Sequence, residues 1–129
     1  MTKEFLKQHL EKLKEAKALE FEIQNMQNMV KSPTLSWTPI AHTNSDKIGE
    51  IVSKIEIKQV RLLAKINAIL EEEKEIERVI DTLKDGREKA VCRYRYISGL
   101  SWEEVCVKAH YSWQHVHRIH ATALKNMNM

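Results

Sequence analysis

The last stretch of the chain carries side chains that can hydrogen-bond to the edges of DNA bases. Gln114 can pair with adenine, and Arg118 with guanine or with a phosphate. Trp113 can contact a thymine methyl group, and the alternative for it is a hydrophobic contact with a neighbouring helix. The hydroxyl and amide of Ser112 suit a phosphate if Ser112 begins a helix. Because helical spacing puts these side chains on one face, the predicted DNA-contacting set is Ser112, Trp113, Gln114, His117, Arg118 and Lys125.

The competing chemistry in the same stretch is metal binding, because four of the six histidines lie there. The candidate ligands are His115, His117 and His120, with His110 or Cys106 as a further one. On a helix His117 and His120 are neighbours, but His115 points about 200° away from His117. No second cluster completes a tetrahedron. We therefore expect no metal site.

Catalytic chemistry is not indicated by any motif of the chain. It has no glycine-rich phosphate loop, no nucleophile elbow and no alternating α/β pattern, so we expect neither enzyme activity nor a cofactor. Cys92 and Cys106 are too far apart for a CxxC motif and indicate neither a disulfide framework nor a zinc cluster. Cys106 is interpreted as structural, because a small side chain is needed where two helices cross closely.

The distribution of charge also favours a nucleic-acid partner at the C-terminal end. The whole chain has a formal net charge of +3, and residues 85–129 alone hold seven Lys and Arg against four Asp and Glu. Five of the eight aromatic residues are in the same segment. No apolar run approaches the roughly 20 residues that span a bilayer, and charges replace the apolar core of a signal peptide. We therefore expect a cytoplasmic protein with no membrane partner.

Two short, capped helices must position the DNA-contacting side chains. Ser101 and Glu104 form a capping box that begins a helix ending near Ala109. Residues 110–111 make a tight turn, and Ser112 caps a last helix that reaches about Met127. This is the pattern of a helix-turn-helix. The apolar residues that face each other across it are Val105, Cys106 and Ala109 on the first helix and Val116, Ile119 and Ala123 on the second, with Tyr111 in the turn.

The rest of the chain is predicted to be helical as well. Residues 2–29 form one helix, residues 31–44 a linker with two prolines, and residues 45–84 a longer helix capped by Ser45. Gly86 is expected to end that helix in a left-handed conformation, and a third helix runs over 87–97. We divide the chain into a helical part, 1–84, and a DNA-binding module, 85–129.

The long helix has an apolar row at intervals of seven residues. Its members are Ile48, Ile55, Leu62, Ile69, Ile76 and Leu83, with Val52, Ile66 and Ile80 in a companion row. A row of this length predicts coiled-coil packing. The partner is either the first helix folded back antiparallel or the same helix of a second chain, which would make a homodimer.

The stretch from Leu83 to Leu124, with Arg93-Tyr94-Arg95-Tyr96-Ile97-Ser98-Gly99-Leu100-Ser101-Trp102-Glu103-Glu104 and then Tyr111-Ser112, resembles region 4 of sigma-70 type initiation factors. It is similar in particular to short phage-encoded regulators of the ArpU/RinA kind and to related phage proteins known only as a domain of unknown function. The resemblance implies an all-α fold, with a long helical hairpin or coiled coil before a region 4-like helix-turn-helix. It implies control of phage or prophage late genes in a bacterial host cell, with RNA polymerase as a further candidate partner. His110 stands where the turn glycine is usual, so the resemblance does not extend to recognition of the promoter hexamer.

We therefore predict a sequence-specific transcriptional regulator that binds double-stranded DNA. One alternative is a phage small terminase subunit, which also joins a helix-turn-helix to long helices but forms large rings. The other is an interaction module that contacts RNA polymerase without reading DNA.

Overall fold

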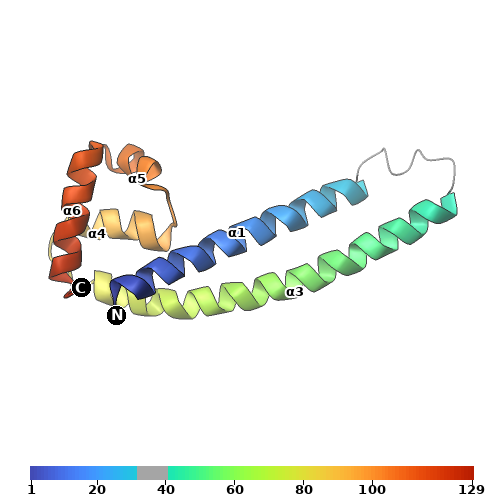
Figure 1. The fold of residues 1–129 in the computed structure, drawn as a ribbon, viewed down its shortest axis with the longest axis horizontal. Coiled ribbons are helices and arrows are strands. Elements are labelled where there is room, and N and C mark those ends of the chain that lie inside the picture. Colours follow the sequence, from blue (N-terminus) through green and yellow to red (C-terminus); the bar gives the residue numbers. More distant parts are fainter. Residues whose placement is uncertain (32–40) are drawn as a thin grey trace. The chain divides into compact units, whose positions relative to one another are not determined.

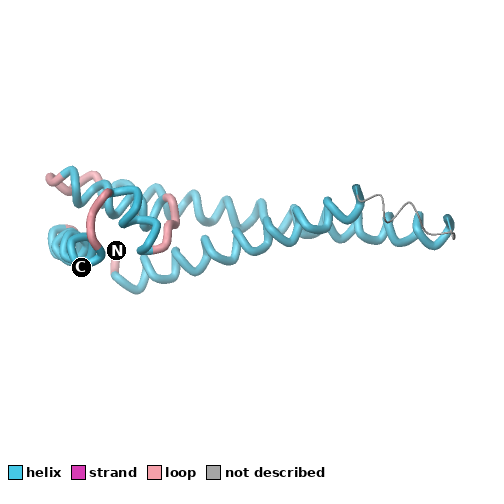
Figure 2. Tube along the Cα trace, turned by 90° about the horizontal axis from the view of Figure 1, so that it is seen from above, coloured by secondary structure: helices cyan, strands magenta, loops and turns pink. Residues whose placement is uncertain are grey.

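The protein is built from helices. The structure, a computed structural model, describes the backbone of residues 1–31 and 41–129 and the side chains of residues 1–31 and 46–129. No strand occurs in these residues (Figure 2), which confirms the predicted all-α class. In chain order the elements are α1 (Lys3–Lys31), α3 (Ala41–Ile80), α4 (Gly86–Cys92), the π-helix η1 (Arg93–Ile97), α5 (Trp102–Ala109) and α6 (Trp113–Asn126). None of the described helices combines the length and the apolar character that crossing a membrane requires.

The chain divides into two compact units, and the simpler one comprises residues 15–67. In it the second half of α1 and the first half of α3 lie side by side (Figure 1). Lys58 Nζ lies 2.9 Å from Glu22 Oε2, and Lys65 Nζ lies 3.2 Å from Glu15 Oε2. The later residue on α3 pairs with the earlier residue on α1, so the two helices are antiparallel.

The predicted apolar row of α3 is only partly buried. Ile55, Ile69 and Ile76 are 8%, 5% and 0% exposed, whereas Val52 and Ile66 of the companion row are each 38% exposed. Because the antiparallel neighbour of this row is α1, the seam is closed within one chain. The structure thus shows the first of the two predicted partners, α1 folded back antiparallel, and the alternative of a homodimer stays a prediction.

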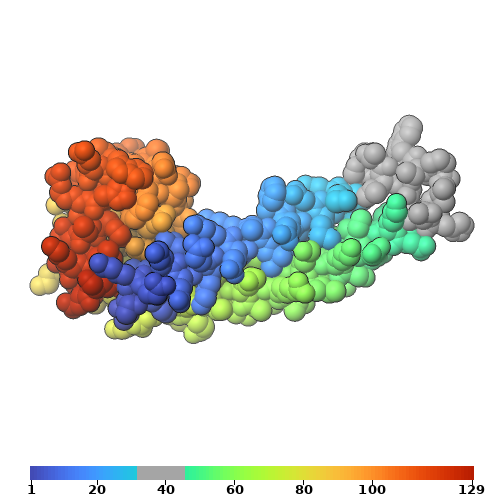
Figure 3. Space-filling model, in the orientation of Figure 1, coloured from blue at the N-terminus to red at the C-terminus, as the bar shows by residue number. Residues whose placement is uncertain are grey.

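The second unit joins Met1–Lys14 to Ala68–Met129. In Figure 3 the first residues, in dark blue, lie against the orange and red C-terminal helices. Two hydrophobic clusters hold this unit together. The larger comprises Leu6, Ile76, Ile80, Leu83, Cys92, Tyr96, Ala123 and Met127, and the smaller Val91, Val105, Val116 and Ile119. The start of α1 is therefore part of the same core as the C-terminal helices.

His9 of α1 is a polar link inside this core, with no exposed surface. Its Nδ1 lies 2.9 Å from Glu72 Oε2 on α3, and its Nε2 lies 3.1 Å from the carbonyl oxygen of Tyr96 on η1. Both partners accept, so both contacts are hydrogen bonds at once only when both ring nitrogens carry a proton. Burial opposes ionisation of Glu72, but hydrogen bonds from Lys12 and His9 outweigh it and hold the pKa of this carboxyl below its usual value. His9 thereby ties three helices to one another.

The ends of the two long helices differ in part from the prediction. Thr2 Oγ1 accepts from the amide of Phe5 at 3.2 Å, as expected of a cap for α1. Ser45 is not a cap, because α3 already begins at Ala41 and no proline or glycine interrupts residues 41–45. The predicted linker 31–44 otherwise lies mostly outside the described residues.

The predicted end of the long helix at Lys84 is wrong by four residues. Helix α3 ends at Ile80, and the hydroxyl of Thr82 donates to the carbonyl of Val79 at 2.6 Å. The turn that follows leaves Leu83 only 3% exposed in the larger cluster. Burial of Leu83 favours the turn over one more helical turn. The predicted boundary after Lys84 consequently falls inside one compact unit.

The role predicted for Gly86 is also wrong. Gly86 is the first residue of α4, and Asp85 is the cap, its carboxylate accepting from the amide of Arg87 at 2.8 Å. An aspartate in this position satisfies amides at the start of the helix. The left-handed glycine of the region is Gly99, with φ of 70°, after η1.

Candidate nucleic-acid interface

Helix α5 begins at the predicted capping box. Ser101 Oγ accepts from the amide of Glu104 at 3.2 Å, and Glu104 Oε1 accepts from the amide of Ser101 at 3.1 Å. The reciprocal bonds satisfy two backbone amides that have no partner within the helix. They fix the start of α5 and thereby the direction in which Val105, with no exposed surface, enters the core.

Three residues connect α5 to α6. His110 has φ of 59°, in the left-handed region, and the amide of Tyr111 donates to the carbonyl of Cys106 at 3.2 Å. Ser112 caps α6 as predicted, because its Oγ accepts from the amide of His115 at 3.2 Å. The ring of Tyr111 stacks on that of His115, with centroids 4.6 Å apart. The turn is therefore held at both ends by local contacts.

The inner face of α6 is the predicted one. Val116, Ile119 and Ala123 are 0%, 9% and 0% exposed. Val116 and Ile119 pack in the smaller cluster with Val91 of α4 and Val105 of α5. This packing sets the rotation of α6 about its own axis and so decides which side chains face outward.

The outer face presents five of the six predicted DNA-contacting residues to solvent. The exposed residues are Ser112, Trp113, Gln114, Arg118 and Lys125. For Gln114, Arg118 and Lys125, no side-chain hydrogen bond or ion pair occurs within the described parts of the chain. Two of them are fixed positive charges, and no acidic residue lies on α6. The outer face is thus polar, cationic and free to bind.

His117 and Ser112 already make contacts within the protein, and His117 is also half-buried. The ring of His117 lies between two indoles, with centroids 4.6 Å from Trp102 and 4.4 Å from Trp113. Its Nε2 is buried and finds no hydrogen-bond partner among the residues that the structure describes. The hydroxyl of Ser112 already serves as the cap of α6. Both residues can therefore orient neighbours as well as contact a ligand.

Trp102 and Arg95 belong to the site and were absent from the predicted set. The guanidinium carbon of Arg95 lies 4.6 Å from the centroid of the Trp102 ring, and Arg95 Nη1 donates to the carbonyl of Leu100 at 2.9 Å. Trp102 also contacts His120, with centroids 4.6 Å apart. The alternation of basic and aromatic residues over 93–96 was the signal that could have identified Arg95, but sequence spacing alone does not show which ring it covers.

His120 is held neutral beside this cluster. Burial, with smaller effects of His117, Arg95 and Lys3, lowers the pKa of His120 from 6.5 to about 4. Burial likewise raises the pKa of Tyr96 to about 12. The phenol therefore keeps its proton, and its oxygen is hydrogen-bonded to His120 Nε2 at 2.7 Å.

The histidines of the region do not assemble into a metal site. Across residues 1–31 and 46–129, no group of three or more His, Cys, Asp or Glu side chains is close enough to hold an ion. Each of the three candidate histidines on α6 instead contacts an aromatic ring. Burial raises the pKa of the Cys92 thiol to about 12, so this cysteine stays protonated.

A comparison with known families gives the chain its affiliation. Residues 51–128 match the sequence profile of a family described as "Protein of unknown function (DUF1492)". The match covers more than half of the sequence, so the chain belongs to this family. No curated protein and no solved structure matches the chain.

Proposed function

We propose that this member of the family is a transcriptional regulator that binds double-stranded DNA through the outer face of α6. The observation that carries the proposal is the unpaired set Gln114, Arg118 and Lys125 on a helix whose inner face is locked in the core. A rigid helix with free donors on one side meets the geometric requirement for reading bases in the major groove. Free cations also supply the attraction to phosphates on which DNA affinity depends.

The two-helix arrangement supports a helix-turn-helix interpretation of α5 and α6. Recognition helices contact base edges from their N-terminal turns, where Trp113, Gln114 and Arg118 lie. In our proposal Gln114 reads an adenine, Arg118 reads a guanine or holds a phosphate, and Trp113 contacts a thymine methyl group. Lys125, about three turns after Gln114, contacts the sugar-phosphate backbone of the DNA.

The proposed biological setting follows from the resemblance of residues 83–124 to region 4 of sigma-70 type factors. We propose that the chain controls transcription in a phage or prophage, with late genes as targets and RNA polymerase as a second partner. His110 in the turn separates it from factors that read the promoter hexamer. We accordingly expect the DNA sequence that the protein binds to differ from the promoter hexamer.

A second candidate function is that of a phage small terminase subunit. The observation that favours it is the exposure of apolar side chains within residues 15–67: Ile57, Val60 and Leu63 are 56%, 69% and 60% exposed. Exposed apolar side chains of this number favour self-association. The solution mass distinguishes the candidates, since a monomer or dimer supports the regulator and a ring of eight or more subunits supports the terminase subunit.

The test of DNA binding begins with selection of bound sequences from fragmented phage DNA, followed by fluorescence anisotropy on the selected duplex. Arg118→Ala is expected to weaken specific binding by about 1–3 kcal/mol with little change in thermal stability. Arg78→Ala is the matched control, because Arg78 is exposed on α3 and pairs with Glu75. If no duplex is enriched, or if Arg118→Ala binds as the wild type does, the proposed reading face is wrong.

A further inference from the structure

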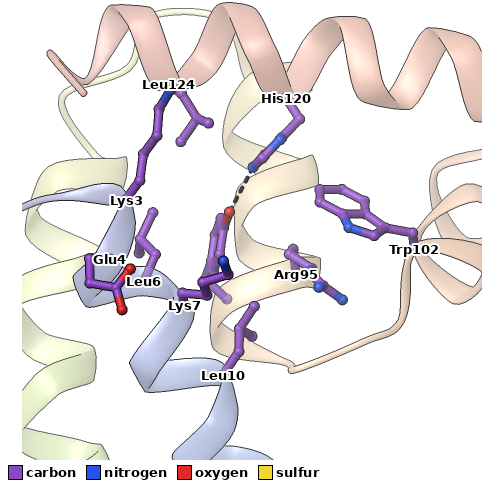
Figure 4. A pocket seen from close by; sticks show the side chains of 10 residues that line it. Lys3, Glu4, Leu6, Lys7, Leu10, Arg95, Trp102, His120 and Leu124 are labelled. Atoms are coloured by element: carbon purple, nitrogen blue, oxygen red, sulfur yellow. Dashed lines mark hydrogen bonds between the residues drawn. The ribbon is translucent and has the colours of Figure 1, made fainter.

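A cavity of about 340 Å³ opens where the start of α1 meets the C-terminal helices. Figure 4 shows Lys3 and Lys7 on one side of it and Trp102 with Arg95 on the other, with the hydrogen bond from Tyr96 to His120 between them. The full lining is Lys3, Glu4, Leu6, Lys7, Leu10, Arg95, Tyr96, Trp102, His120 and Leu124. The walls come from α1, near the start of the sequence, and from the consecutive helices η1, α5 and α6 near its end.

The cavity borders the outer face of α6. His120 and Leu124 of α6 line the cavity. Trp113 and His117 lie seven and three residues before His120 on the same helix. Residues at such spacings lie along the same side of a helix. The ring contact of His117 with Trp102 makes the same connection in space. A ligand lying along the outer face of α6 would therefore pass over the cavity on this side.

The cavity is electropositive, and its two lysine side chains are not engaged in ion pairs within the described residues. Three cationic side chains line it against one carboxylate, that of Glu4. Lys3 and Lys7 are exposed and have no ion pair in residues 1–31 or 46–129. Arg95 Nε is buried and has no hydrogen-bond partner within the same residues. The charges of Lys3 and Arg95 also contribute, after burial, to the lowered pKa of His120. The same positive charges that disfavour protonation of His120 attract an anion.

We propose that Lys3 and Lys7 of α1 hold the DNA backbone beside the reading helix, with a phosphate group at the mouth of this cavity. A helix in the major groove has a sugar-phosphate backbone on each side. Contacts of the protein with these backbones set the orientation of the helix. In this protein the contact to one of these backbones comes from the first residues of the chain, more than a hundred positions before α6. The inference rests on the proposed DNA binding. It assigns the N-terminal helix to the interface, which the resemblance of residues 83–124 does not do.

The test measures how DNA affinity depends on salt. The full chain is titrated into a fluorescein-labelled 24-base-pair duplex of mixed sequence by anisotropy, at several KCl concentrations between roughly 50 and 200 mM, where counterion release is measurable. Lys3→Gln combined with Lys7→Gln should make the slope of log Kd against log salt shallower by about two, since each lost phosphate contact removes about 0.9. A loss of affinity of about tenfold is expected at 100 mM KCl.

The matched control removes the same charge elsewhere. Lys14 and Lys74 are 70% and 73% exposed and pair with Glu11 and Glu71. Their double replacement by Gln should change the affinity less than about twofold and leave the slope unaltered. Lys3→Arg with Lys7→Arg should retain the wild-type slope, which shows that charge matters and not a disturbed fold.

The possible outcomes separate this inference from the proposed function. If the wild type does not bind the duplex, both fall. If the wild type binds and the Lys3/Lys7 double variant keeps its slope, only the phosphate site at the cavity is refuted. Equal losses in the Lys3/Lys7 and Lys14/Lys74 variants would refute it as well, because the effect would then be one of net charge.

Discussion

The two compact units differ in how completely their apolar side chains are packed. In the unit of Met1–Lys14 and Ala68–Met129, side chains such as Val91 and Val116 have no exposed surface, and the buried His9 is bonded on both sides. In residues 15–67, Val60 and Leu63 remain largely exposed, and the ion pairs lie at the surface. A tightly packed core defines one geometry, whereas a helical pair with exposed apolar residues is less strictly specified. The candidate site lies in the former unit, where side-chain positions are held.

The sharpest test of this contrast places one substitution in both units. Val116→Asp puts a carboxylate into the smaller cluster and should cost more than about 4 kcal/mol of unfolding free energy, enough to unfold the module. Val60→Asp, at a side chain 69% exposed, should change stability by less than about 0.5 kcal/mol. Thermal unfolding followed by circular dichroism measures both. Similar losses for the two variants would mean that Val60 is buried against a partner.

The next effect concerns polar links. His9→Ala leaves the carbonyl of Tyr96 and the carboxylate of Glu72 without their partner, and should cost about 2–3 kcal/mol. Lys58→Ala, which removes an ion pair with the exposed Glu22, should cost less than about 0.5 kcal/mol. Urea denaturation gives both values. A small loss for His9→Ala would contradict its role as the link between α1, α3 and η1.

A pH dependence should distinguish His120. The unfolded ring takes up a proton near pH 6.5, but the folded ring does so only near pH 4. The unfolded state therefore binds more protons between these values, and stability contributed by the neutral ring is lost as the pH falls from about 6.5 to 4. Because the ring is partly exposed, we expect a loss of about 1–2 kcal/mol. Denaturation midpoints of wild type and His120→Gln, measured between pH 4 and 7.5, should approach each other toward low pH, because only the wild type loses this contribution. Parallel curves would show that His120 is not the group responsible.

The smallest expected effect is a gain of stability in the turn before α6. His110→Gly should stabilise the fold by about 0.5–1 kcal/mol, because glycine adopts the left-handed conformation without strain. His110→Ala keeps the strain and serves as the control. A stabilisation by both variants would mean that the imidazole itself, and not the backbone, is unfavourable.

Local features were predictable because they depend on residues close together in the chain. The capping box of Ser101, the cap at Ser112 and the inner face of α6 all follow from spacings of three and four. The end of α3 was predicted wrongly because a distant contact decides it: Leu83 packs with Cys92 and Met127. The role of Gly86 was decided locally, since Asp85 caps the helix that Gly86 begins.

The candidate site divides in the same way. The exposed residues Gln114, Arg118 and Lys125 could be listed from the helical period, and their reading role stays a prediction. The place of His117 between two indoles could not, because Trp102 reaches it from another helix.

The sequence by itself determined the all-α class, the helical period and the caps at Ser101 and Ser112, since these depend on neighbours within a few residues. Only the tertiary structure decided that the apolar row of α3 is closed by α1 of the same chain. It also decided that Lys3 and Lys7 share a cavity with His120, and that Arg95 covers Trp102. Such pairs are separated by many residues or by a turn, and their proximity results from burial of one common core, for which no local pattern codes.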